Sequence, residues 1–260
     1  MISFSKIRVA VLATLVMLCC TACDYDPFDP PIGPRNEKKA ADRALEGVSW
    51  LSPTDRMHFL ERKPINPAIL MRLAENRTPA VRALVAINTA TPDDLLYKLA
   101  NDSNVGVRQF LVQNRTISRG FLLQIKEKES SPLVLETMVG NPAWTSDDLW
   151  QFYRAGSARY NIAINPSSPP DLLAELLHSE QDDRNMVLSG LELNPHISSK
   201  LLEQIVRRAG PQDRAAKLNA LNHPALTPEV CYFLQNDADE DVRWNVQDVL
   251  QRSGCRNKRS

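Results

Sequence analysis

The sequence is built on a unit of 23 to 29 residues that returns each time to an asparagine. The clearest copy runs from Asn88 to Asn114 and has the sequence NTATPDDLLYKLANDSNVGVRQFLVQN. Thr91 is expected to cap a first helix, with Asp93 and Asp94 at the positive end of its dipole. A run of turn residues then separates it from a second short amphipathic helix. Because two helices this short cannot bury their apolar faces alone, each unit needs a neighbour of the same kind.

The unit recurs through most of the chain. The first helices are expected to open at Asn66, Thr91, Ser118, Ser146, Pro169, Ser198 and Thr227. The asparagines that precede these openings are Asn88, Asn114, Asn141, Asn165, Asn194 and Asn222. Helix–turn–helix content at this interval predicts an all-α solenoid of about seven helical hairpins.

Two stretches resemble the leucine-rich repeat variant (LRV) family: the copy quoted above, and NPSSPPDLLAELLHSEQDDRNMVL. The family pattern runs roughly Asn-Pro, two residues, Pro, Leu-Leu, Leu-Ala, Asp and Val-Arg. The resemblance covers residues 66 to about 250 and implies a right-handed superhelix whose units pair an α-helix with a shorter, sometimes 3₁₀, helix. The intervals here are mostly longer than the typical LRV unit, so ordinary α-helices of the HEAT-like kind remain an alternative at the second position.

One LRV family member carries an iron–sulfur cluster on clustered cysteines, and we do not transfer that property. Only Cys23, Cys231 and Cys255 lie outside the expected signal segment, too few for a four-thiolate cluster. We therefore expect no cofactor and no metal.

The first residues have the features of an export signal. Lys6 and Arg8 form a short basic region, and the apolar stretch from Val9 to Leu18 is too short to predict a membrane span. A simple secretory signal or a single membrane anchor is the alternative to the lipoprotein signal described next.

The end of this segment, Cys-Thr-Ala-Cys at residues 20–23, resembles the lipobox of bacterial lipoproteins. That resemblance implies cleavage before Cys23 and lipid on its thiol and amine. Asp24 follows directly, and in lipoproteins of enteric-type bacteria an aspartate there implies retention at the inner membrane. We therefore expect a lipid-anchored protein that faces the periplasm.

These features divide the chain into five segments. The expected order is a lipoprotein signal peptide (1–22), a lipidated N-terminus with a Pro-rich tether (23–36), capping helices (37–65), the repeat domain (66–252) and a basic tail (253–260).

An arginine recurs in the second helix of the units. Arg82, Arg108 and Arg159 each stand six residues before an asparagine, and Arg184, Arg214 and Arg243 occupy similar places with looser spacing. Apolar residues one before and three after place the arginine at the flank of the buried face. Its guanidinium is expected to reach carbonyls or acids of an adjacent unit, and a basic groove for phosphates is the alternative. Arg82, Arg108, Asn88, Asn114 and Asn165 are thus expected to be structural repeat positions.

Two aromatic residues follow such arginines directly. On the helical wheel, Tyr160 and Trp244 point away from the core, beside Arg159 and Arg243. Exposed Tyr, Trp and Arg side chains are frequent anchors of protein interfaces, so these four are candidate partner-binding residues. The alternative is that loops or the terminal arm cover them.

Cys231 and Cys255 are candidates for a disulfide. Cys231 is expected near the start of the first helix of the last unit, and Cys255 just past the end of that unit's second helix. Antiparallel helices bring such positions together, and an exported chain meets an oxidising environment. A buried Cys231 with a free thiol in the tail is the alternative.

The sequence contains no recognisable catalytic motif. Its four histidines lie in different units, and the formal net charge of zero gives no sign of a nucleic-acid binder. We expect a scaffold without catalysis that binds an unidentified protein or envelope component. The alternative is a nucleic-acid-binding or enzymatic HEAT-like domain whose N-terminus only resembles an export signal.

Overall fold

The computed structural model describes residues 41–60, 65–178, 184–210 and 213–252, and every element in these ranges is an α-helix. In these ranges the prediction of an all-α fold is confirmed, and the second helix of each pair is α rather than 3₁₀. The segments predicted to form the signal peptide, the tether and the basic tail lie outside the described residues. The chain divides into two compact units, Met1–Ala143 (unit 1) and Trp144–Ser260 (unit 2).

Unit 1 begins with helical residues 41–46. It continues with α3 (Pro53–Leu60), α4 (Pro67–Ala74), α5 (Pro79–Ile87), α6 (Asp93–Leu99), α7 (Val105–Val112), α8 (Arg119–Lys128) and α9 (Pro132–Met138). Unit 2 contains α10 (Ser146–Arg154), α11 (Arg159–Ile164), α12 (Pro170–His178), α13 (Arg184–Leu193), α14 (Ser199–Arg208), α15 (Arg214–Leu221), α16 (Pro228–Leu234) and α17 (Glu240–Arg252).

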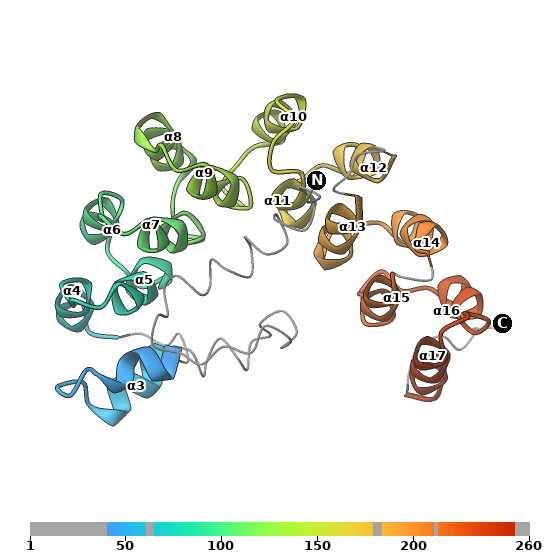
Figure 1. The fold of residues 1–260 in the computed structure, drawn as a ribbon, viewed down its shortest axis with the longest axis horizontal. Coiled ribbons are helices and arrows are strands. Elements are labelled where there is room, and N and C mark those ends of the chain that lie inside the picture. Colours follow the sequence, from blue (N-terminus) through green and yellow to red (C-terminus); the bar gives the residue numbers. More distant parts are fainter. Residues whose placement is uncertain (1–40, 61–64, 179–183, 211–212, 253–260) are drawn as a thin grey trace, which may run out of the picture. The chain divides into compact units, whose positions relative to one another are not determined.

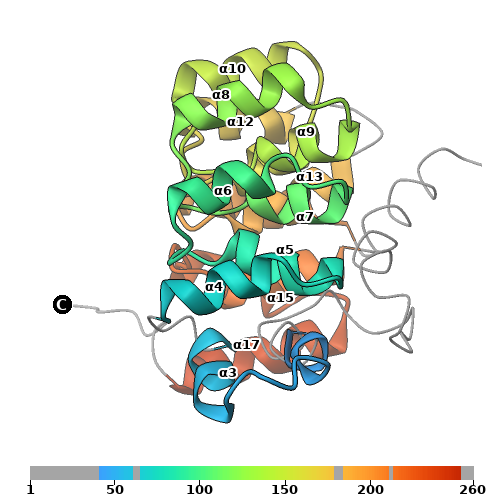
Figure 2. The ribbon, with the colours of Figure 1, turned by 90° about the vertical axis from the view of Figure 1, so that its left-hand side faces the viewer.

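Within each unit the helix pairs stack so that first and second helices form separate layers (Figure 1). In unit 1, α5 packs on α7 and α7 on α9, while α4, α6 and α8 lie side by side in the other layer (Figure 2). In unit 2 the second helices α11, α13, α15 and α17 pack in succession in the same way. We call the layer of second helices the inner layer and the layer of first helices the outer layer.

The core lies between the two layers. In the outer layer Leu96 and Leu99 of α6 are buried, and in the inner layer Val107 and Leu111 of α7 are buried. These residues stand three or four apart and therefore share one face of each helix. Each such side chain contributes about 1.5–3 kcal/mol when it leaves water, so the stack of pairs, and not any single pair, supplies the core.

The helix starts follow the expected capping chemistry with one correction. Ser118 and Ser198 cap α8 and α14 through their hydroxyls, and Thr145 forms a capping box with Asp148 at α10. Thr91 does not cap α6, because Pro92 takes the N-cap position. Thr91 is instead buried, and its hydroxyl donates to the carbonyl of Val85 at 2.6 Å, which ties the end of α5 to the start of the next pair.

The shortest interval between openings, from Ser146 to Pro169, has a local cause. Helix α11 has only six residues, whereas α5 has nine and α7 has eight. The turn before α11 uses left-handed backbone at Gly156 (φ 71°) and at Ala158 (φ 54°), which lets the chain enter α11 after a shorter path.

Helix α13 approaches α11 closely at Gly190. A Cβ atom there would lie 2.9 Å from the Ala163 Cβ and 3.2 Å from the Tyr160 backbone oxygen. Gly190→Ala should therefore lower the free energy of unfolding of unit 2 by about 1 kcal/mol, the overpacking penalty exceeding the gain in helix propensity. Gly120→Ala in α8, whose Cβ would meet only Ser118 Oγ at 3.9 Å, should stabilise unit 1 slightly. Urea unfolding of both variants measures the two effects, and a stabilising Gly190→Ala would contradict the close approach.

Candidate functional site

Arg82 and Arg108 each bridge from their own helix pair to the next. The Nε and Nη2 atoms of Arg82 donate to the carboxylate of Asp102 at 2.7 and 2.9 Å, and those of Arg108 donate to Glu129 at 2.8 and 3.1 Å. The remaining Nη1 atom donates to a backbone carbonyl of the arginine's own turn, that of Asn76 or Asp102, at 2.8 and 2.7 Å. Each guanidinium thus joins two successive turns.

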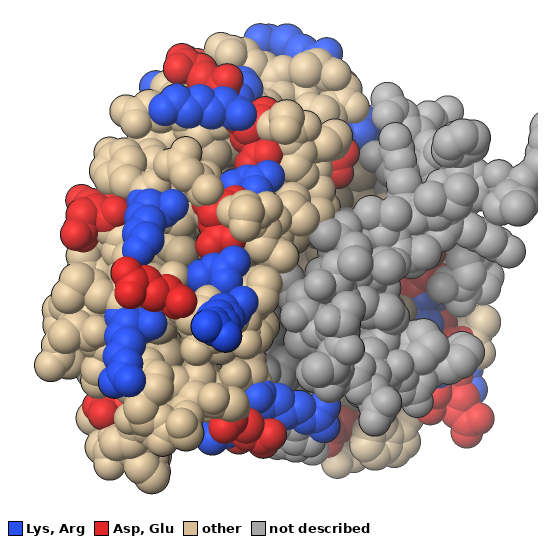
Figure 3. Space-filling view, turned by 60° about the vertical axis from the view of Figure 1, so that its left-hand side comes forward, with Lys and Arg blue, Asp and Glu red and all other residues tan. Residues whose placement is uncertain are grey.

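These pairs neutralise one another in a partly buried setting. Burial opposes ionisation of Asp102 and Glu129, but hydrogen bonds from Arg82 and Arg108 and from backbone N–H groups outweigh it and lower the pKa of both carboxyls. Hydrogen bonding to the carboxylates raises the pKa of both arginines. Basic and acidic side chains accordingly alternate along this side of the molecule instead of gathering in a patch of one sign (Figure 3).

In unit 2 a lysine takes the corresponding place. Lys217 Nζ binds Asp237 Oδ2 at 2.7 Å, and both side chains are nearly buried. The sequence assigns this place to Arg214, which is wrong: Arg214 lies at the start of α15 and pairs on the surface with Asp239 and Asp241. The side chain of Arg184 lies outside the described part of the chain.

The recurrent asparagines form a second ladder, between backbones. Asn114 Nδ2 donates to the carbonyls of Ala86 and Asn88 at 2.8 and 2.9 Å, and Asn141 Nδ2 donates in the same way to Val112 and Asn114 at 2.7 and 2.9 Å. In unit 2, Asn194 makes the equivalent bonds to Ala163 and Asn165 at 2.8 Å each. The Oδ1 atom of each ladder residue accepts from the backbone N–H two residues ahead, as at Asn88 and Asn165.

The last step of this ladder is a histidine. Asn222 is exposed and bonds within its own helix, to Leu218 O, whereas the buried His223 lies against Asn194 O through Nε2 at 3.0 Å. Since His223 Nδ1 accepts from the Ala225 N–H, Nε2 carries the proton and donates to Asn194 O. The assignment of Asn222 to the ladder is therefore wrong by one residue.

The structure separates the four candidate partner-binding residues. Arg159 is buried, with its guanidinium 5.5 Å from the ring centroid of Tyr153. Tyr160 is partly buried against α13, where its Cδ2 would meet a Gly190 Cβ at 3.1 Å. Arg243 is bound to its own turn through Nη1, and Trp244 is 66% exposed. Helices α13 and α15 lie between α11 and α17 in the inner layer, so the two aromatic residues do not share a surface.

Sequence reasoning missed an apolar stripe on the outer layer. One outward-facing position recurs in every pair, nine residues after the ladder residue. In α4 the equivalent position is the one that follows the buried Leu70. In unit 1 this position holds Met71, Tyr97 and Leu123, and in unit 2 it holds Trp150, Ala174, Glu203 and Tyr232. Met71 is 50% exposed, Tyr97 46% and Tyr232 46%. The Tyr97 ring packs on the buried ring of Phe121 in the next pair, with 4.1 Å between the ring centroids.

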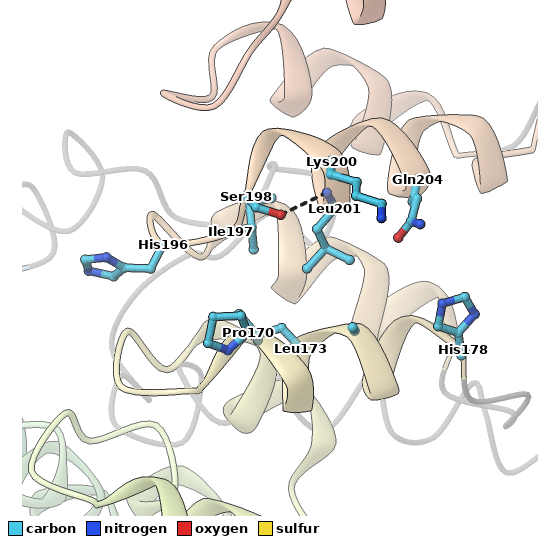
Figure 4. Close-up of a pocket in the computed structure, with 10 residues that line it drawn as sticks. Pro170, Leu173, His178, His196, Ile197, Ser198, Lys200, Leu201 and Gln204 are labelled. Carbon is cyan, nitrogen blue, oxygen red and sulfur yellow. Dashed lines mark hydrogen bonds between the residues drawn. The ribbon is translucent and has the colours of Figure 1, made fainter.

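A groove opens in unit 2 where that position holds a small residue. Ala174 in α12 leaves a cavity of about 220 Å³ against α14, lined by Leu173, Leu201, Lys200 and Gln204 among others. Figure 4 shows His178 and His196 at opposite ends of it, and the Ser198 hydroxyl accepts from the Leu201 N–H at 3.1 Å. The lining of the groove is mixed, with leucine side chains beside the polar groups of Ser198, Lys200 and Gln204.

Family models, curated proteins and solved structures were compared with this chain, and none matched.

The remaining site predictions fall partly outside the described residues. Cys23 and Asp24 lie outside them. Cys231 is buried and disulfide-bonded. Its partner is not among the described residues, and pairing with Cys255 stays a prediction. Within the described ranges, no group of three metal-binding side chains occurs, and no helix is long and apolar enough to span a bilayer.

One buried carboxyl group is unexpected. Glu192 in α13 is 2% exposed, its Oε2 accepts from Asn219 Nδ2 at 3.3 Å, and its Oε1 has no hydrogen-bond partner. Burial raises the pKa of Glu192 to about 7; the Asn219 bond opposes the shift, and the charge of Asp213 adds to it.

Proposed function

We propose that this chain is a membrane-anchored repeat scaffold that binds another protein or an envelope component at the cell-envelope surface, without catalysis. In this proposal its helix pairs form a right-handed α-solenoid of about seven repeats of the LRV or HEAT-like kind. The asparagine ladder supports it, because the same bonds join successive pairs within each unit. So does the cation ladder, the name used here for Arg82, Arg108 and Lys217 with the acid that each binds in the next pair.

The observation that carries the binding role is the apolar stripe on the outer layer. Large apolar side chains held in the open on rigid helices favour association with another protein. In unit 1, Met71 and Tyr97 occupy the same position of consecutive pairs and are each about half exposed, at 50% and 46%.

The recurrent cations support protein binding over nucleic-acid binding. A phosphate-binding groove needs guanidinium groups that are free to meet phosphate. In Arg82 and Arg108 the Nε and Nη2 atoms, which form the fork of the guanidinium, instead bind Asp102 and Glu129.

Photo-crosslinking tests the binding role. A benzoylphenylalanine at position 97 is expected to give an adduct with another protein in intact cells. The same residue at position 113, where an exposed glutamine stands in unit 1, should give none. Adducts of equal yield at both positions, or adducts to nucleic acid, would contradict the proposal.

Membrane attachment has a separate test. Cys23→Ala should move the protein from the membrane pellet to the soluble fraction and abolish labelling by tritiated palmitate. The reason is that two acyl chains, at about 0.8 kcal/mol per buried methylene, anchor a protein stably. Cys19→Ala, inside the expected signal, serves as the matched control and should change neither result. Wild type and Cys23→Ala in the same fraction would show that Cys23 is not the anchor.

A further inference from the structure

The last helix pair repeats the local structure of the pair that contains Arg108. Asp102 and Asp237 each stand six residues before an arginine and bind a cation of the preceding pair. Arg108 Nη1 donates to Asp102 O at 2.7 Å, and Arg243 Nη1 donates to Asp237 O at 2.7 Å. The two guanidinium groups are therefore held on their own turns in the same way.

The two arginines differ in what their forks bind. Arg108 Nε and Nη2 hold Glu129 of the following pair. No helix pair follows α17 among the described residues, and there the hydrogen bonds of Arg243 are all made by Nη1. Its Nε and Nη2 atoms are the two donors with which Arg82 and Arg108 bind a carboxylate.

The next residue along the helix also faces the following pair. Gln109 Nε2, after Arg108, donates to Thr137 Oγ1 of α9 at 3.1 Å. Tyr160, after Arg159, packs against Gly190 of α13. Trp244 holds this position after Arg243 and is 66% exposed. An aromatic ring at a contact position thus stands uncovered beside the open fork.

We propose that this edge of α17 is a docking surface for a helical segment of a partner protein that carries a carboxylate. The segment takes the place of a following pair: its carboxylate binds Arg243 Nε and Nη2, and its apolar face covers Trp244. The inference rests on the proposed scaffold function and adds to it the surface and the chemistry of the partner.

A carboxylate on a helix fits both halves of this edge. The fork of an arginine matches a carboxylate in two parallel hydrogen bonds, as Asp102 and Glu129 show in unit 1. A tryptophan beside an arginine is the composition typical of the residues that dominate binding energy at protein interfaces. A free anion would meet the fork but would leave the ring exposed.

The test uses two stapled helical peptides, rich in leucine and alanine, that differ at one position by glutamate or glutamine. They are titrated into the full mature chain carrying Cys23→Ala, and NMR follows the Arg243 Nε–H and Trp244 indole N–H signals. The glutamate peptide should shift both signals, and the glutamine peptide should bind about tenfold more weakly. Arg243→Lys should weaken binding of the glutamate peptide about fivefold and Trp244→Ala about tenfold.

Matched variants in the same unit serve as controls. Arg207→Lys and Phe233→Ala alter an exposed arginine and an exposed phenylalanine of the outer layer and should leave the affinity unchanged. Urea unfolding of all four variants is expected to show the stability of the parent chain.

Four results would overturn the inference. They are equal affinity for the two peptides, insensitivity to Arg243→Lys, a dimer of the chain that Arg243→Lys dissociates, and a shift of the Arg243 signal when residues 253–260 are deleted. The third would assign the edge to a second copy and the fourth to the chain's own tail. If the peptides fail to bind but the crosslinker at position 97 gives a specific adduct, the scaffold function stands and only this inference is lost. If both experiments fail, the scaffold function is lost as well.

Discussion

Asn114→Ala is expected to lower the free energy of unfolding of unit 1 by about 2–4 kcal/mol. The Asn114 side chain is fully buried and donates to the carbonyls of Ala86 and Asn88. Its Oδ1 accepts from the backbone and the hydroxyl of Thr116. Alanine removes all four bonds. Each buried group left without a partner costs about 1–3 kcal/mol, and Asn88 O keeps a bond from the Thr91 N–H at 3.0 Å, which limits the total.

Hydrogen exchange in α5 and α7 isolates this effect from unit 2, since amides in these helices report the opening of unit 1. Asn114→Asp should be worse than alanine, because a carboxylate oxygen would then face two carbonyl oxygens. Asn222→Ala, at an exposed asparagine outside the ladder, should cost less than about 0.5 kcal/mol. Equal losses for Asn114→Ala and Asn222→Ala would contradict the ladder.

The asparagine ladder was predictable as a periodicity but not as a set of bonds. The recurrence of Asn88, Asn114 and Asn165 predicted repeated helix pairs, and the all-α fold follows from it. The misplaced last step shows the limit of matching one residue type. His223-Pro-Ala aligns with Asn141-Pro-Ala, and an imidazole can supply the same donor and acceptor as an amide.

The prediction of the recurrent cation was wrong in the same helix pair and for the same reason. Lys217 stands six residues before His223, as Arg82 stands six before Asn88. Searching for arginine selected Arg214 instead, whose carboxylate partners lie on the surface. Spacing from the correct ladder residue would have identified Lys217, and its acid, Asp237, stands six before Arg243.

The helical wheel could not place the aromatic residues. It considers the face of one helix toward its own partner helix, so it sends Tyr160 and Trp244 to solvent alike. In the stack, the residue that follows the recurrent cation faces the second helix of the next pair. At Tyr160 that helix is α13, which packs against the ring. Trp244 is exposed because no described pair follows α17. Exposure at this position depends on the place in the stack, which a single helix does not encode.

Glu192 shows what the sequence did not signal at all. It lies in the helical stretch Met-Val-Leu-Ser-Gly-Leu-Glu-Leu, where a single acid beside an exposed Leu193 is expected to face water. The close packing of α13 against α11 and α15 buries it instead, with Oε1 unsatisfied. The ionised form is therefore penalised, and the native state holds the proton more tightly than the unfolded chain does.

Glu192→Gln should remove a pH dependence from the stability of unit 2. In the wild type the pKa rises from 4.5 in the unfolded chain to about 7 in the folded one. Between these values the native state binds more protons, so the free energy of unfolding falls as pH rises from about 4.5 to about 7 and is level above. At 1.36 kcal/mol per unit of pKa, the loss at pH 8 is about 3 kcal/mol.

The glutamine variant should therefore match the wild type near pH 4.5 and exceed its stability by up to about 3 kcal/mol at pH 8. Urea unfolding at both pH values, followed by exchange in α13 and α15, measures the difference. All other side chains are the same in the two proteins, so their contributions to the pH dependence cancel. A ¹³C titration of the Glu192 carboxyl gives an independent midpoint. A midpoint near 4.5 would show that this carboxyl is ionised in the folded protein without penalty. The same conclusion would follow if the difference in the free energy of unfolding between Glu192→Gln and the wild type were equal at pH 4.5 and pH 8.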